Sequence, residues 1–152
     1  MMAQNPIPRP EHPRPDFVRP DWLNLNGVWQ FAFDEADEGH AKGFQNPGQP
    51  LPLKIQVPFC HECELSGVND KRFAKALWYR RSFEVPNALK SRRALLRFGA
   101  VDYRCEVFVN GISAGAHVGG YTPFALDVTR LLKDGENDLC VRVEDDRDCT
   151  QP

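Results

Sequence analysis

One stretch decides the fold class of this chain: Tyr103-Arg104-Cys105-Glu106-Val107-Phe108-Val109-Asn110-Gly111-Ile112-Ser113-Ala114-Gly115. Tyr103, Cys105, Val107 and Val109 alternate with Arg104, Glu106 and Phe108. This two-residue period is typical of a half-buried strand. Asn110-Gly111 suits a type I′ turn, because both positions of that turn need a positive φ that Asn and Gly tolerate. The sequence therefore predicts a β-hairpin here.

Working outward from the hairpin, the rest of the chain shows further short runs of the same kind. Trp29, Phe31 and Phe33 place three large rings on one face of such a run. Gly- and Pro-rich segments separate the runs, notably 34–52 and 59–75, and the second of these has room for one helical turn. The six further predicted strands cover 27–33, 54–57, 77–85, 94–98, 124–128 and 138–144. About eight short strands with almost no helix predict an all-β fold, an antiparallel β-sandwich or jelly roll.

Composition divides the chain into a lead-in and one domain. Six of the 13 prolines lie within residues 1–21, which predicts an extended N-terminal segment. Residues 22–152 then form the predicted sandwich. With 152 residues in all, the chain is too short for a (β/α)₈ barrel, which needs about 250.

Charge and hydropathy exclude several classes of partner. The formal net charge is −2, from 19 Lys+Arg and 21 Asp+Glu, so we expect no nucleic-acid partner. No run of eighteen or more apolar residues predicts a membrane span, and the first residues do not resemble a secretory signal. Five cysteines are an odd number and too few for a disulfide scaffold. We therefore expect reduced thiols in a cytoplasmic protein.

Cys60-His61-Glu62-Cys63 is a Cys-x-x-Cys pattern, which can supply half of a zinc site. A structural zinc site needs two further ligands, and the chain has no second pattern of this kind. A redox role needs a helix N-terminus after a strand in a βαβ unit, which an all-β chain does not offer. Metal or redox chemistry is therefore a minor hypothesis, and we expect no cofactor.

Glu144, Asp145, Asp146 and Asp148 crowd the end of the last predicted strand. Such carboxylates can hold a hard cation such as Ca²⁺ or accept hydrogen bonds from sugar hydroxyls. They can equally form a solvated loop, which composition alone favours. Nothing in the sequence places two isolated carboxylates across a cleft as a glycosidase needs.

The three tryptophans could stack on sugar rings. Trp29 and Trp78 lie within predicted strands, so we expect both in the core. Trp22 precedes the first strand, and we expect it to cover an edge of the core. Gly119-Gly120 follows His117 without the Lys-Ser/Thr of a phosphate loop, so no phosphate site is predicted.

Taken together, the motifs resemble the N-terminal sugar-binding domain of glycoside hydrolase family 2, which includes β-galactosidases, β-glucuronidases and β-mannosidases. The resemblance covers roughly residues 20–152, and it rests on the number, order and spacing of the motifs. They are Leu25-Asn26-Gly27-Val28-Trp29, Val57-Pro58, Leu65-Ser66-Gly67, Trp78-Tyr79-Arg80-Arg81-Ser82-Phe83, Phe98-Gly99-Ala100-Val101-Asp102-Tyr103, Val109-Asn110-Gly111, Gly119-Gly120-Tyr121-Thr122-Pro123-Phe124, Asp127-Val128-Thr129 and Asn137-Asp138-Leu139.

The resemblance implies a jelly roll of the galactose-binding kind. In the family, an immunoglobulin-like domain and a (β/α)₈ barrel follow, and the barrel supplies both catalytic glutamates. No residue of this chain would then be catalytic. A loop after the last strand of the domain reaches the barrel mouth in some β-galactosidases, which implies a sugar contact at Asp148, with Asp145 and Asp146 as the next candidates.

Two functions follow from these observations. The first is a non-catalytic carbohydrate-binding and scaffold domain of a β-galactosidase-like glycosidase, which we expect to be inactive alone. Its expected partners are carbohydrate and the later domains, and a homo-oligomer is compatible with this function. The second is a stand-alone lectin-like module whose acidic loop takes Ca²⁺. Sugar binding without a barrel present distinguishes the second from the first.

Overall fold

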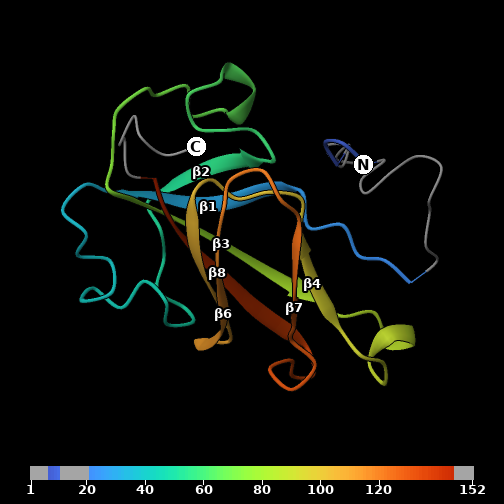
Figure 1. Ribbon diagram of the computed structural model, residues 1–152. Helices are drawn as coiled ribbons and strands as arrows, with labels where there is room; N and C mark the ends of the chain where they lie inside the picture. Colours follow the sequence, from blue (N-terminus) through green and yellow to red (C-terminus); the bar gives the residue numbers. More distant parts are fainter. Residues whose placement is uncertain (1–6, 11–20, 146–152) are drawn as a thin grey trace, which may run out of the picture.

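A computed structural model describes residues 7–10 and 21–145 of the chain (Figure 1). The described residues form eight strands, as the sequence predicts, and two short 3₁₀-helices, of which the first lies in the segment 59–75 where room for one helical turn is predicted. The strands are β1 (Gly27–Asp34), β2 (Leu53–Val57), β3 (Ala76–Glu84), β4 (Leu95–Phe98), β5 (Arg104–Val109), β6 (Ile112–Val118), β7 (Phe124–Asp127) and β8 (Glu136–Glu144), and the 3₁₀-helices are η1 (Glu64–Ser66) and η2 (Asn87–Leu89).

The strands form two antiparallel sheets of unequal size. The large sheet has the order β2-β1-β3-β8-β5-β6, and β4 pairs with β7 in a sheet of two (Figure 1). Leu96 and Phe98 of β4 pack against the same core as the inner face of the large sheet. The predicted all-β sandwich is therefore confirmed, with one layer much wider than the other.

The predicted hairpin is β5–β6. Asn110 and Gly111 have φ of 53° and 79°, which is the pair of positive values that a type I′ turn requires. The Asn110 side chain also ties this turn to β8, because its Nδ2 donates to the Asn137 Oδ1 at 2.9 Å and its Oδ1 accepts from the Asp138 amide at 3.0 Å. The turn is therefore held by the neighbouring strand as well as by its own geometry.

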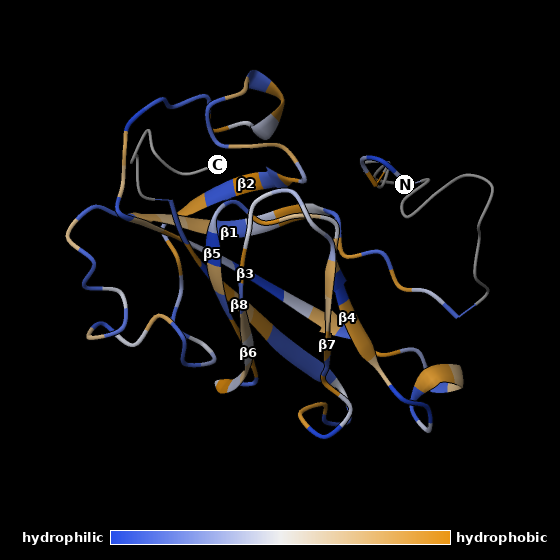
Figure 2. Ribbon diagram, in the orientation of Figure 1, coloured by the Kyte–Doolittle hydropathy of each residue, from blue (hydrophilic) through white to orange (hydrophobic). Residues whose placement is uncertain are grey.

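The inner face of the large sheet carries the main core, as the alternation predicts. Trp29 and Phe31 of β1 are buried there, together with every second residue of β5 and β8. In Figure 2, β8 shows a polar band followed by an apolar band, because Cys140 on its outer face is apolar as well. The inward side chains of β5 and β8 are Cys105, Val107, Val109, Leu139, Val141 and Val143.

The outer face of the large sheet is also covered, which the sequence did not predict. Trp78 is fully buried there with Cys140, and Phe44 from the segment between β1 and β2 packs onto them. Trp78 is thus a core residue, as expected, but it lies on the face opposite Trp29. The Gly- and Pro-rich segment 35–52 forms the second cover of the sheet.

Arg80 holds this cover in place. It is 2% exposed, and its guanidinium donates to the carbonyl oxygens of Phe44, Asn46 and Gln49. Its charge is balanced by Asp138, whose Oδ2 lies 3.0 Å from the Arg80 Nε. One buried cation therefore satisfies three backbone acceptors that a Pro-rich segment cannot pair in a sheet.

No helix among the described residues is long and apolar enough to cross a membrane.

Candidate functional site

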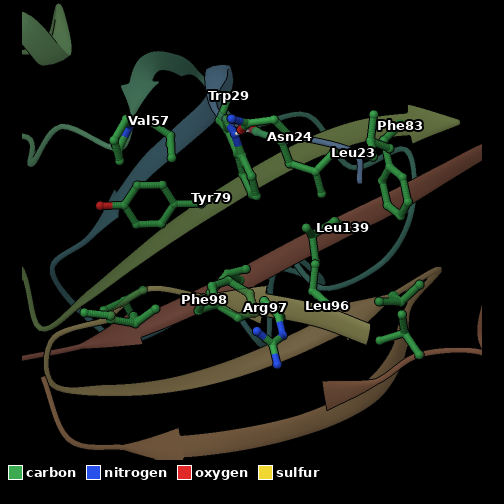
Figure 3. Close-up of a pocket in the computed structure, with 18 of the residues that line it drawn as sticks. Leu23, Asn24, Trp29, Val57, Tyr79, Phe83, Leu96, Arg97, Phe98 and Leu139 are labelled. Atoms are coloured by element: carbon green, nitrogen blue, oxygen red, sulfur yellow. Dashed lines mark hydrogen bonds between the residues drawn. The ribbon is translucent and has the colours of Figure 1, made fainter. Parts of the chain in front are cut away.

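A cavity of about 680 Å³ lies against the inner face of the large sheet (Figure 3). Tyr79, Phe83 and Leu139 form its floor. Leu96 and Phe98 of β4 form one wall. Leu23, Asn24, Trp29 and Val57 form the opposite wall.

The cavity follows from the unequal layers of the sandwich. The two-stranded sheet is too narrow to cover the six strands below it. Beside it, the chain supplies irregular segments, 21–25 and 58–62, which also line the cavity. Irregular segments cannot interdigitate with a sheet as a third or fourth strand would, so a space remains between them and β4.

The wall at residues 24–26 is fixed by hydrogen bonds. The Trp29 Nε1 donates to the Leu25 carbonyl oxygen at 2.8 Å, and the Arg81 Nη1 donates to the carbonyl oxygens of Leu25 and Asn26, each at 2.9 Å. The Asn24 Oδ1 accepts from the Asn26 amide at 2.8 Å. The Asn24 Nδ2, at the other end of the same amide, is buried and has no hydrogen-bond partner among the described residues.

Some of the charged groups that line the cavity form ion pairs. Arg72 pairs with Asp70 at 2.7 Å, and Arg92 pairs with Asp21. Inside, burial raises the pKa of the Tyr79 hydroxyl, so this group stays neutral across the physiological range. The floor therefore carries an uncharged hydroxyl at Tyr79, while charged side chains, among them Glu62, Arg97 and Asp102, also line the cavity.

The acidic residues after β8 do not form one cluster within the described chain. Asp145 is exposed and lines the cavity. Glu144 pairs with the Arg142 Nη1 at 2.5 Å, on the outer face. Asp146 and Asp148, the other candidates for a sugar contact, lie outside the described residues. The structure thus places Asp145 at the sandwich end and directs Glu144 away from it.

The Cys60-x-x-Cys63 segment does not gather metal ligands. Cys60 is exposed and Cys63 is partly buried. His61 is turned away from them: its Nδ1 lies 2.7 Å from the Asp70 carbonyl oxygen, and its ring stands edge-on to Phe33. In the described part of the chain, no three His, Cys, Asp or Glu side chains are placed to hold a metal ion.

A buried ionic group on the outer face was missed by the sequence reasoning. The Arg142 side chain is 6% exposed and pairs with Asp37 as well as with Glu144. The Arg142 guanidinium, which donates to Asp37, lowers the pKa of that carboxyl. The available signal was Trp78, because a strand with a large ring on each face must be covered on both sides, and Arg142 lies opposite Trp78 in the β3–β8 register.

A comparison with known protein families shows to which family this chain belongs. Residues 42–150 match the model of "Glycosyl hydrolases family 2, sugar binding domain". This chain belongs to that family. The resemblance inferred from the motifs is therefore confirmed.

Full-length relatives and a solved structure place the family 2 domain within larger proteins. The β-glucuronidase of Canis lupus familiaris is 30% identical over 77% of this chain and 19% of its own length, and the β-galactosidase of Thermoanaerobacter pseudethanolicus is 35% identical over 81% and 16%. The structure of Lactobacillus rhamnosus β-glucuronidase is similar with a TM-score of 0.73 and 36% identity, covering 82% of this chain and 21% of that one. The chain spans about a fifth of the length of such relatives.

Proposed function

We propose that this chain is the non-catalytic N-terminal carbohydrate-binding and scaffold domain of a larger β-glycosidase that hydrolyses O-glycosidic bonds. The observation that carries the proposal is the coverage: most of this chain matches about a fifth of each relative. Because these relatives are β-glucuronidases, we propose an activity of the β-glucuronidase type, rather than of the β-galactosidase type, for the whole protein.

The proposed role of the domain is to shape the sugar pocket from the side. Asp145 leaves β8 at the end of the sandwich, so the residues that follow it start from this end. A carboxylate there accepts short, charge-assisted hydrogen bonds from two adjacent sugar hydroxyls. We keep Asp148, Asp146 and Asp145 as the proposed sugar contacts, with immunoglobulin-like and barrel domains as the proposed neighbours.

The test of the non-catalytic role uses the 152-residue chain itself. The purified protein is incubated with 4-nitrophenyl β-glucuronide and with 4-nitrophenyl β-galactoside, and release of nitrophenol is followed. We expect no release above the rate without protein, because 152 residues are too few for the (β/α)₈ barrel, which supplies both catalytic glutamates in the family. Turnover that survives further purification would overturn the proposal.

The alternative is a lectin-like module that binds sugar unaided. The observation in its favour is that the family model matched over residues 42–150 describes a sugar-binding domain. Isothermal titration of the chain with galactose, glucuronate and mannose, with and without Ca²⁺, tests it. Saturable heat would support the module, and flat titrations at millimolar sugar would exclude it.

A further inference from the structure

We propose that the turn at Cys60 and Cys63 is a modification site, at which the two thiols form a reversible disulfide in response to a low-molecular-weight disulfide such as glutathione disulfide. This disulfide only has to close and open. It therefore needs two thiols within bridging distance and access for the oxidant, rather than the helix N-terminus of a catalytic dithiol.

The backbone already gives the two cysteines the span of a disulfide. Residues 60–63 form a β-turn, in which the Cys63 amide donates to the Cys60 carbonyl oxygen at 3.1 Å. The first and last Cα atoms of a β-turn lie less than about 7 Å apart, and disulfides join Cα atoms about 4.4–6.8 Å apart. Closing the bridge is therefore a matter of rotating two side chains.

The turn is held in this form by the residues that follow it. The Cys63 carbonyl oxygen accepts from the Ser66 amide at 3.1 Å and from the Ser66 hydroxyl at 2.7 Å. The His61 carbonyl oxygen accepts from the Asp70 amide at 3.0 Å, and the His61 Nδ1 lies 2.7 Å from the Asp70 carbonyl oxygen. Because the turn is ordered before oxidation, little further chain entropy is lost when the ring closes.

The unequal burial of the two thiols sets the order of the exchange. Cys60 is exposed and Cys63 is partly buried, so the Cys60 thiolate attacks one sulfur of glutathione disulfide and one glutathione thiolate leaves. The Cys63 thiolate then attacks the Cys60 sulfur of the mixed disulfide, and the second glutathione thiolate leaves. Each leaving thiolate takes up the proton that one cysteine has lost. The two cysteines are thus oxidised by two electrons, and glutathione disulfide is reduced to two molecules of glutathione.

The other two cysteines that the structure describes are poor competitors for this exchange. Cys105 and Cys140 are 1% and 0% exposed, on opposite faces of the large sheet. A thiol that the solvent does not reach exchanges slowly. The proposed disulfide therefore lies within one turn, and it does not depend on the proposed carbohydrate role of the domain.

Thiol trapping and mass spectrometry test the proposal on the 152-residue chain. The folded protein is equilibrated with excess glutathione disulfide and about 0.1 mM glutathione, its free thiols are blocked with N-ethylmaleimide, and it is digested with trypsin. The tryptic peptide of residues 55–71 contains Cys60 and Cys63 and no other cysteine. A thiol tethered this closely has an effective concentration of about 1 mM or more, so the peptide with the internal disulfide should exceed the glutathione-bearing peptide about tenfold or more. After treatment with dithiothreitol, the same peptide should carry two maleimides.

Two variants assign the effect to the turn. Cys63→Ser keeps the first exchange step and removes the second, so its peptide should carry glutathione on Cys60 in place of the disulfide. Cys149→Ser is the matched control and should form the disulfide as the wild type does, because the bridge needs only the two cysteines of the turn. A cooperative thermal transition shows that each variant is folded.

Either of two results would overturn the proposal. The first is a wild-type peptide that carries two maleimides, or retains glutathione on Cys60, since the turn would then not close. The second is a disulfide that joins this peptide to another cysteine or that is lost in Cys149→Ser, since Cys63 would then not be the partner of Cys60.

Discussion

At the scale of single residues, the two strand tryptophans serve different faces of one sheet. Trp29 is 6% exposed in the inner core, whereas Trp78 is fully buried under segment 35–52. The Trp78 Nε1 donates to the Asp34 Oδ2 at 2.9 Å, and Asp34 also accepts from the amides of Glu38 and Gly39. Trp78 thus packs on the outer face and also hydrogen-bonds to Asp34, which holds the turn after β1. Trp29 packs in the inner core and also hydrogen-bonds to the Leu25 carbonyl oxygen in the wall of the cavity.

Replacing Trp29 tests its place in the core. Trp29→Ala should lower the free energy of unfolding by about 3–5 kcal/mol, as for other large buried rings. Val28→Ala is the matched control, because Val28 is the neighbouring residue, is 51% exposed, and should change stability by less than about 0.5 kcal/mol. Urea unfolding measures both. A loss below about 1 kcal/mol for Trp29→Ala would place that ring at the surface.

The cysteines should divide by burial. Burial raises the pKa of the Cys140 thiol to about 12 and also raises that of Cys105. A buried, protonated thiol is a poor nucleophile, so both should react with a disulfide reagent only after unfolding. Cys60, which is exposed, should react in the folded protein.

A thiol count checks this division. Cys60→Ser should remove one fast-reacting thiol, whereas Cys140→Ser should leave the fast count unchanged. Fast reaction lost in Cys140→Ser instead would contradict the burial of that side chain.

Asp127 gives the fold a pH-dependent contribution. Hydrogen bonds from Thr129 and then from Arg93 lower the pKa of this carboxyl to about 2. A folded-state pKa below the unfolded value, about 3.9, contributes stability that is present above that value and lost as the pH falls toward 2. The loss should therefore fall between about pH 4 and pH 2.

The variant Asp127→Asn should flatten this acid dependence. Urea unfolding at about pH 5, 3.5 and 2.5 compares its slope with that of the wild type. Asp134→Asn is the control, since the Asp134 side chain is 94% exposed. Parallel curves for wild type and Asp127→Asn would contradict the assignment.

At the scale of elements, the strands were predictable because their signals are local. Alternation and Asn110-Gly111 specify the β5–β6 hairpin within about 13 residues, and the bounds in the structure differ from the predicted ones by few residues. The cover formed by segment 35–52 was not predictable in the same way. Its anchor is Arg80, more than thirty residues away, and its partner carbonyls carry no side-chain signature.

Arg80→Met should loosen segment 35–52 while leaving the inner core in place. Three carbonyl oxygens would lose their donor and Asp138 would lose its cation, so trypsin should cut faster after Lys42. Ser82→Ala is the control on the same strand, since Ser82 is exposed. Limited proteolysis followed by mass spectrometry measures the site and the rate. Equal rates in the two variants would show that the segment is held by packing alone.

At the scale of the whole molecule, the site was only partly accessible to sequence reasoning. The motif order indicated the family, and the comparison confirms it over residues 42–150. The sequence analysis grouped Glu144 with Asp145. Strand alternation instead places Glu144 on the outer face, where it forms an ion pair with Arg142. The cavity was not predicted, because it arises from the unequal width of two sheets, which no local pattern reports.

The proposed scaffold role is most directly tested by the size of the native polypeptide in the source cells. An antibody against the purified chain is used in an immunoblot of a whole-cell lysate, with the purified 17.3 kDa chain alongside as the size standard. The account predicts a band larger by at least the roughly 250 residues of a (β/α)₈ barrel. A band at 17.3 kDa would contradict it and leave the lectin-like module as the function to test.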